Sequence, residues 1–176
     1  LSEIDRMTAT LEQLLLLARL DTSSKAADEY SRPLATIIDE ILSRYKNKIS
    51  EKKLSINFKN EVDNETLVPQ YFTNLILENI IGNAAKYAKD ATKIHISITQ
   101  LESKIVCKVK DEGIGIRKED LEHLFNNFFR SEALNHKNIS GNGLGLSIAK
   151  KAADAIDASI FVESELGSGT TFTLQF

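Results

Sequence analysis

The sequence lacks the features that mark secreted, membrane-spanning or nucleic-acid-binding chains. Its single cysteine, Cys107, cannot form an internal disulfide bond, which fits a reducing compartment. The longest apolar run covers residues 14–18, far short of the roughly 20 residues that a spanning helix needs. No signal peptide is present. The net charge is −3 with scattered Lys and Arg residues, so we expect no nucleic-acid partner and a cytoplasmic location.

What is present suffices for one core. With 176 residues, 42% hydrophobic and 27% charged, the chain can bury one ordinary core and carry a short appendage. The chain opens on Leu1 within a helical pattern, so we expect a fragment of a longer protein. Any membrane anchor would then lie upstream.

The first segment predicts a long helix. Apolar residues recur at alternating spacings of three and four, typical of a coiled-coil or helix-bundle seam: Ile4, Met7, Leu11, Leu14 and Ala18. Two interpretations remain open, namely a helix packed on its own domain and the second hairpin helix of a dimeric bundle. Small polar residues follow from Asp21 onward, as in a linker. We therefore expect a domain boundary between residues 1–24 and 25–176.

The rest of the chain alternates between helical and strand patterns. Apolar spacing predicts helices at residues 34–45, 69–88, 118–128 and 145–156. Alternation predicts strands at residues 54–58, 93–99, 104–110, 159–163 and 170–176, with Cys107 on a buried face. Because the strands pair locally and the helices group apart from them, the pattern predicts an α+β fold, a two-layer sandwich with helices on one face of a mixed sheet.

Two polar features could carry chemistry. On the helix 69–88, Asn79, Asn83, Lys86 and Tyr87 project from one side. Amide oxygens suit Mg²⁺ when phosphates supply the charge, although a solvated helix face is the ordinary explanation of such residues. After the strand 104–110, Asp111 could accept a hydrogen bond from an exocyclic amine such as that of adenine. The alternative is a common Asp/Gly turn.

A third feature, residues 141–146, is rich in glycine and leads directly into a predicted helix. Flexible backbone N–H groups at a helix N-terminus can bind phosphates. The spacing fits neither a Walker loop nor the dinucleotide-binding fingerprint, and protein-kinase signatures are also absent. A flexible glycine-rich lid is the remaining interpretation.

The order of these features resembles the catalytic domain of sensor histidine kinases. Residues 79–87 resemble its N box, residues 125–130 its F box, and residues 111–115, 141–146 and 167–170 its three G boxes. Residues 17–20 resemble the end of the dimerisation and phosphoacceptor hairpin. The resemblance implies the histidine-kinase/gyrase-type ATPase fold, preceded by one long N-terminal helix.

The resemblance also implies roles for single residues. Asn83 is expected to coordinate Mg²⁺ with the help of Asn79, while Lys86 and Arg130 contact the phosphates of ATP. Asp111 is expected to accept the adenine amine. The other residues expected at the nucleotide are Tyr87, Gly113, Gly115, Phe128, Gly141, Gly143, Leu144, Gly145, Leu146 and Thr170. Among these, Gly143 and Gly145 would let the lid close.

The expected reaction is phosphoryl transfer rather than hydrolysis. Gyrase-like relatives carry a glutamate one turn before the magnesium asparagine, and Asn79 occupies that place here. The expected acceptor is a histidine outside this chain, because His95, His123 and His136 lack the acidic neighbour of the family's phosphoacceptor. The implied partners are a response regulator and a second copy bound through the first helix, in a parent protein of the inner or plasma membrane.

Three alternatives to this function exist. A nucleotide-holding regulatory module would need a damaged site, whereas every box residue is present. A serine-directed kinase of the anti-sigma type would lack both the hairpin-like helix and the F box. Phosphatase activity toward the response regulator stays open. Two departures from the family pattern, Pro69 before the N-box helix and Asp157 with Ala158 in place of a glycine pair, leave the boxes intact.

Overall fold

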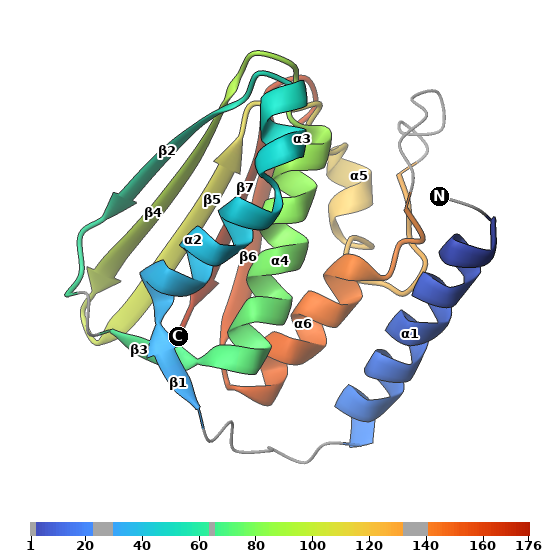
Figure 1. Ribbon diagram of the computed structural model, residues 1–176, viewed down its shortest axis with the longest axis horizontal. Helices are drawn as coiled ribbons and strands as arrows, with labels where there is room; N and C mark the ends of the chain where they lie inside the picture. The colour runs from blue at the N-terminus through green and yellow to red at the C-terminus, as the bar shows by residue number, and fades with distance from the viewer. Residues whose placement is uncertain (1–2, 23–29, 64–65, 132–140) are drawn as a thin grey trace.

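Two periodicities separate helices from strands in the sequence, and the structure follows both. The computed structural model describes residues 3–22, 30–63, 66–131 and 141–176 (Figure 1). The helices are α1 (Glu3–Thr22), α2 (Leu34–Arg44), α3 (Lys46–Glu51), α4 (Gln70–Tyr87), α5 (Lys118–Leu121) and α6 (Gly145–Ala155). The strands are β1 (Ser31–Pro33), β2 (Ser55–Asn60), β3 (Leu67–Pro69), β4 (Lys93–Leu101), β5 (Lys104–Asp111), β6 (Ser159–Glu165) and β7 (Gly169–Gln175).

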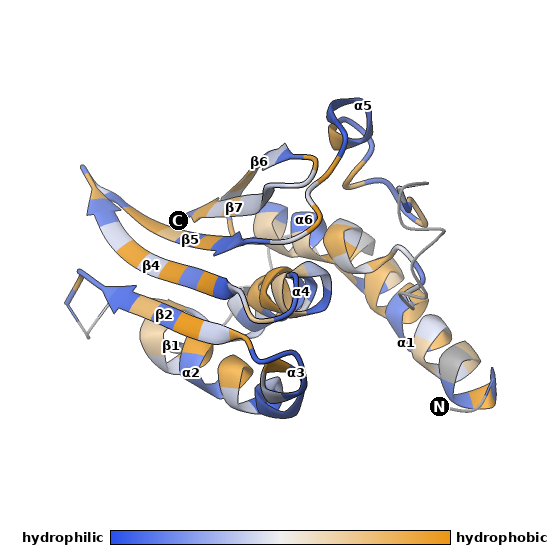
Figure 2. Ribbon diagram, turned by 90° about the horizontal axis from the view of Figure 1, so that it is seen from above, coloured by the Kyte–Doolittle hydropathy of each residue, from blue (hydrophilic) through white to orange (hydrophobic). Residues whose placement is uncertain are grey.

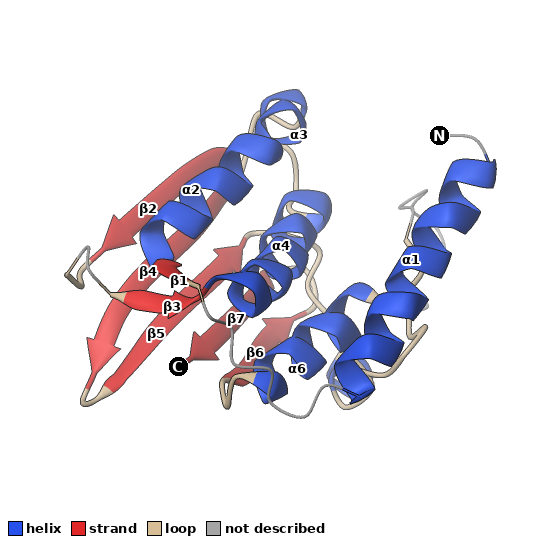
Figure 3. Ribbon diagram, turned by 60° about the horizontal axis from the view of Figure 1, so that its bottom comes forward, coloured by secondary structure: helices blue, strands red, loops and turns tan. Residues whose placement is uncertain are grey.

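The main sheet is mixed and carries helices on one face, which confirms the predicted two-layer sandwich. Its strand order is β2-β4-β5-β7-β6, in which only the β2–β4 pair is parallel among the described strands. Helices α2, α4 and α6 lie along one side of this curved sheet (Figures 2 and 3). The register sets Asp111, the last residue of β5, opposite Thr170 of β7. The carboxylate therefore stands at the end of the central strand, close to α4.

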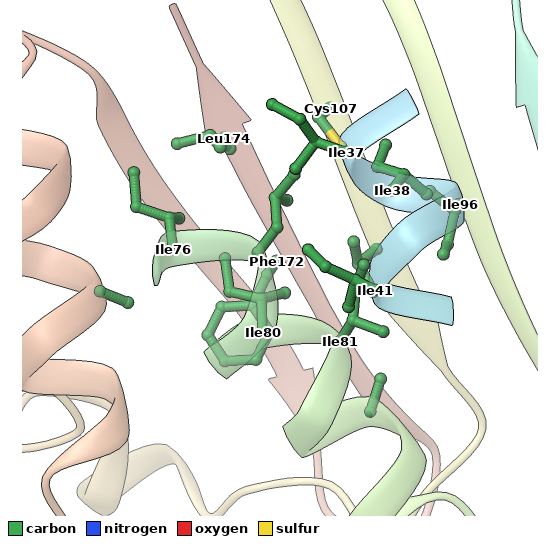
Figure 4. Close-up of a cluster of buried hydrophobic side chains, with 14 of the residues drawn as sticks. Ile37, Ile38, Ile41, Ile76, Ile80, Ile81, Ile96, Cys107, Phe172 and Leu174 are labelled. Carbon is green, nitrogen blue, oxygen red and sulfur yellow. The ribbon is translucent and has the colours of Figure 1, made fainter. Parts of the chain in front are cut away.

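The core lies between the sheet and these helices. Alternate residues of β4 face inward, so Ile96 lies beside Ile38 and Ile41 of α2, while Ile80 of α4 lies beside Phe172 of β7 (Figure 4). Burying one such side chain contributes about 1.5–3 kcal/mol. Cys107 is buried within the same cluster, as its alternation with Val109 predicts. The core thus holds α4 firmly by one face and leaves its polar edge available.

Helix α1 lies beside α6, away from the sheet (Figures 1 and 3). Leu17 is buried in a small separate cluster with Leu144 and Ile148. The predicted seam instead faces outward, with Ile4 75% and Met7 63% exposed. The predicted boundary at residues 24/25 lies outside the described residues. No described helix combines the length and the apolar character needed to cross a membrane.

Several local predictions need correction. The helix expected at residues 118–128 ends at Leu121, and turns follow it. Helix α3 and the small antiparallel β1–β3 ribbon were not predicted. Pro69 occupies the N-cap of α4 without a side-chain cap, which agrees with its predicted effect on the cap alone. Asp157 adopts φ 55°, the left-handed conformation that glycine takes most readily.

Candidate functional site

The sequence-predicted site residues come together around one cavity of about 270 Å³. Helix α4, the end of β5, the start of β7 and the glycine-rich segment before α6 supply its walls. The predicted residues that line it are Asn79, Asn83, Lys86, Tyr87, Asp111, Gly115, Arg130, Gly141, Gly143, Gly145, Leu146 and Thr170. Residues distant in sequence thus form one site.

Three predicted residues do not line this cavity. Phe128 is 57% exposed with φ 63°, and its neighbour Phe129 lines the cavity instead. Leu144 is fully buried against α1, so its side chain has no access to the cavity. A Cβ on Gly113 would lie 2.5 Å from the Tyr87 carbonyl oxygen. Glycine is therefore required there by the close approach of α4, not by the cavity.

Asp111 contributes a buried carboxylate to the cavity lining. Its side chain is only 4% exposed, and within the described chain Oδ1 has no hydrogen-bond partner. Burial raises the pKa of Asp111 to about 6, while backbone N–H groups of Gly113 and Thr170 and the Lys52 charge act in the opposite direction. Because buried acceptors are nearly always paired, this oxygen calls for a donor from a ligand.

The polar edge of α4 leads to a cationic end. Asn79 Nδ2 donates to the Leu75 carbonyl at 2.8 Å, which turns Oδ1 toward Gly145. Lys86 Nζ lies 4.9 Å from the ring centroid of Tyr87. Burial, and then the positive charge of Arg130, lower the pKa of Lys86. An anion between these two cations would relieve their repulsion and offset their desolvation.

The glycine-rich segment fits tightly against this end. Gly143 has φ 75°, and a Cβ there would lie 2.6 Å from the carbonyl carbon of Phe128. A Cβ on Gly145 would lie 2.5 Å from Asn79 Oδ1. The first N–H groups of α6 follow at once, and a helix N-terminus favours negative charge. Glycine is needed here because the backbone passes so close to α4 and to the turn at Phe128.

The donor set suits a hard cation held together with phosphates. The described residues contain no group of three or more His, Cys, Asp or Glu side chains that could hold a metal by themselves. Asn79 and Asn83, which carry amide oxygens, line the cavity, as does Lys86. Neutral oxygen ligands fit Mg²⁺ when the ligand brings the negative charge.

Sequence reasoning missed several lining residues, and the most informative of these comes from α1. Asn142 Nδ2 donates to Gln13 Oε1 at 2.5 Å and to Thr10 Oγ1 at 3.3 Å. Asn142 Oδ1 in turn accepts the Leu144 N–H at 3.2 Å. Gln13 itself lines the cavity. The sequence around Gln13 does not indicate this role, because Gln13 and Asn142 are more than a hundred residues apart in the chain.

Comparisons with known proteins agree with this geometry. Residues 71–176 match the family described as histidine kinase-, DNA gyrase B- and HSP90-like ATPase. The chain is 30% identical over 175 residues to the sensor protein SrrB of Staphylococcus aureus (strain MRSA252), covering 99% of this chain and 30% of that relative. The chain therefore spans about a third of the length of such curated relatives.

Solved structures share the fold. Full-length ShkA in complex with AMPPNP superposes with a TM-score of 0.84 at 21% identity, over 97% of this chain and 35% of that chain. The Acinetobacter baumannii histidine kinase AdeS gives a TM-score of 0.80 at 20% identity, over 98% of this chain and 79% of that chain. Both matches include nearly the whole of this chain.

Proposed function

Because this chain belongs to the histidine kinase-, DNA gyrase B- and HSP90-like ATPase family, we propose that it is the ATP-binding catalytic part of a bacterial sensor histidine kinase. It transfers the γ-phosphoryl group of ATP to a histidine outside this chain, for relay to an aspartate of a response regulator. The observation that carries this proposal is the polarity of the cavity. The lining combines a buried carboxylate that has an unpartnered oxygen with two cations, Lys86 and Arg130, whose charges repel each other.

The carboxylate end receives adenine. Asp111 Oδ1 accepts a hydrogen bond from the exocyclic amine, which supplies the missing donor. Ile114 and Ile116 provide apolar surface for the flat ring, and Leu124 adds to it. Adenine thereby pairs a buried oxygen and covers apolar atoms at the same time.

The cationic end receives the triphosphate. Lys86 and Arg130 contact the phosphates and offset the charge that develops on the transferred group. Asn83 and Asn79 hold Mg²⁺ by their amide oxygens. When bound, this ion neutralises phosphate charge and orients the γ-phosphoryl group for in-line attack.

Transfer is favoured over hydrolysis because the described cavity offers water no suitable base. Among the described residues that line it, Asp111 is the only carboxylate, and we assign it to adenine. Glu78 is turned away, since it accepts from Arg44 at 3.3 Å and from Asn74 at 3.3 Å. A neutral histidine imidazole needs no such base, because its lone pair attacks directly.

The acceptor histidine comes from another segment. His95 and His123 do not line the cavity. The His95 ring lies within hydrogen-bond distance of Asn57, and the His123 ring within that distance of Asn126. His136 lies outside the described residues. The outward seam of α1, which includes Ile4 and Met7, pairs with a second copy in the parent dimer. The parent carries any membrane anchor and presents this part to the cytoplasm.

Calorimetric titration with a non-hydrolysable ATP analogue, with and without Mg²⁺, tests the proposal. We expect binding by the wild type, loss of binding in Asp111→Asn and loss of the Mg²⁺ dependence in Asn83→Ala. Glu163→Gln, on an exposed strand position, is the matched control and should bind normally. Absence of binding at millimolar analogue would overturn the proposal. Phosphorylation of an added phosphoacceptor helix is the next measurement.

A further inference from the structure

The carboxyl end of α4 has no cap from its own sequence. The helix ends at Tyr87, and Ala88 leaves it in an extended conformation with ψ 144°. Within the helix, the Ala88 N–H bonds the Ala84 carbonyl at 2.9 Å. The later carbonyls have no partner further along the helix and need donors from elsewhere. This end matters because Lys86 and Tyr87 both line the cavity.

Lys52 supplies these donors. Its Nζ donates to the Lys86 carbonyl at 3.1 Å, to the Ala85 carbonyl at 3.4 Å and to the Ala88 carbonyl. An ammonium group has three N–H donors, so this arrangement uses its full capacity. A positive charge at a helix C-terminus also interacts favourably with the helix dipole.

Lys52 is itself anchored. It is the C-cap of α3, and its carbonyl accepts the Ala91 N–H at 2.8 Å. The side chain therefore extends from a fixed backbone to the end of α4. Lys53, the next residue, is exposed, and no side-chain contact is described for it. The two lysines form a natural pair for comparison.

The other side of the α4 end is joined to the Asp111 loop. The Tyr87 carbonyl accepts the Ile114 N–H at 3.2 Å, and Lys89 N–H donates to the Glu112 carbonyl at 3.3 Å. Ala88 and Gly113 form an isolated antiparallel bridge. The end of α4 is thus held between the Lys52 ammonium and the loop that carries the adenine acceptor. A shift of this helix end would move Tyr87 relative to Asp111.

We propose that Lys52 is a positioning residue for nucleotide binding, which caps α4 and so fixes Tyr87 and the Asp111 loop in the arrangement that receives adenine. This inference rests on the proposed function. Lys52 lies outside residues 71–176 and does not line the cavity, so it acts through its neighbours. Its charge also favours the ionised form of the Asp111 carboxyl.

The test compares Lys52→Met, which keeps the aliphatic stem but removes the donors, with Lys52→Arg and Lys53→Met. Each variant is titrated with adenosine and with a non-hydrolysable ATP analogue, well below its unfolding temperature. We expect Lys52→Met to raise both dissociation constants by roughly tenfold, the factor for a lost charged hydrogen bond of ordinary strength. Lys52→Arg should recover most of the affinity, and Lys53→Met should bind like the wild type. An equal effect on both ligands places the defect at the adenine end.

A second measurement needs no variant. In the wild type, adenosine should slow the reaction of the Lys52 amine with a lysine-labelling reagent and leave Lys53 unchanged, as read by mass spectrometry. If adenosine left the labelling rate of Lys52 unchanged, the inference would be overturned, even if Lys52→Met failed to fold.

The outcomes separate the two proposals. If the wild type binds nucleotide and Lys52→Met binds equally well, then Lys52 is only a structural cap, and the proposed function stands. If the wild type binds neither ligand, the proposed function fails and the positioning role fails with it.

Discussion

Asp111 is expected to lower the stability of the free protein while serving the ligand. Its carboxyl has an ordinary pKa of 3.8, which burial raises to about 6 in the folded chain. Above this range the group is ionised in both states, and the difference corresponds to about 3 kcal/mol against folding. Well below pH 3.8 the group is protonated in both states, so the penalty is absent there. Stability is therefore lost as the pH rises from about 4 to about 6.

Asp111→Asn removes this penalty and keeps the shape. The new amide brings a donor to the Oδ1 position, where no partner is described, and this costs part of the gain. We expect a net increase of about 1–2 kcal/mol in the free energy of unfolding at about pH 8. At about pH 4 most of the increase should be lost, because the Asp111 carboxyl is then protonated in the folded wild type.

Urea unfolding of both proteins at these two pH values measures the difference. Glu163→Gln removes an exposed carboxylate from the same sheet and should show little change with pH. In the titration proposed above, the same Asp111→Asn variant should no longer bind the ATP analogue. The substitution would then increase stability at the expense of binding. If it is less stable than the wild type at about pH 8, the carboxylate stabilises the fold and the reasoning is refuted.

Three further substitutions test other contacts. Gly143→Ala should weaken binding of the ATP analogue at least tenfold in titration, because a Cβ at its φ of 75° would collide with the Phe128 backbone, and unchanged binding would contradict this close approach. Gln13→Met should weaken the ATP analogue severalfold by releasing Asn142, and an unaltered dissociation constant would contradict this contact's role. Lys53→Gly should raise stability to urea by about 0.5–1 kcal/mol, because φ 53° strains a side chain; a fall in the unfolding midpoint would argue against it.

The sequence predicts the fold well where a pattern repeats over many residues. The apolar spacing within α4 and the alternation within β4 and β5 each report a face packed on the same core. Much of the site can be predicted for the same reason, because many of its residues lie at the ends of helices and strands that the sequence predicts. Asp111 closes β5, and the glycine-rich segment opens α6.

Short and long-range features could not be predicted in the same way. The conformation of the turns after Leu121 depends on the backbone dihedral angles of single residues. These turns place Phe129, rather than Phe128, at the cavity. The β1–β3 ribbon has only three residues in each strand, too few for a pattern. Lys52 and Gln13 act on partners in other elements, and no periodicity along one element reports such a contact.

The two ends of the cavity are fastened by different parts of the chain. Around Asp111, the sheet register, the Ala88–Gly113 bridge and the Lys52 ammonium fix the backbone from several sides. The proposed phosphate end includes the glycine-rich segment, which is joined to α1 through the hydrogen bond from Asn142 to Gln13. In the proposed placement of ATP, a displacement of α1 would therefore change the surroundings of the phosphates and leave the adenine contacts in place. Adenosine affinity should accordingly be insensitive to Gln13→Met even where affinity for the ATP analogue falls, so one helix outside the sandwich can act on transfer without releasing the base.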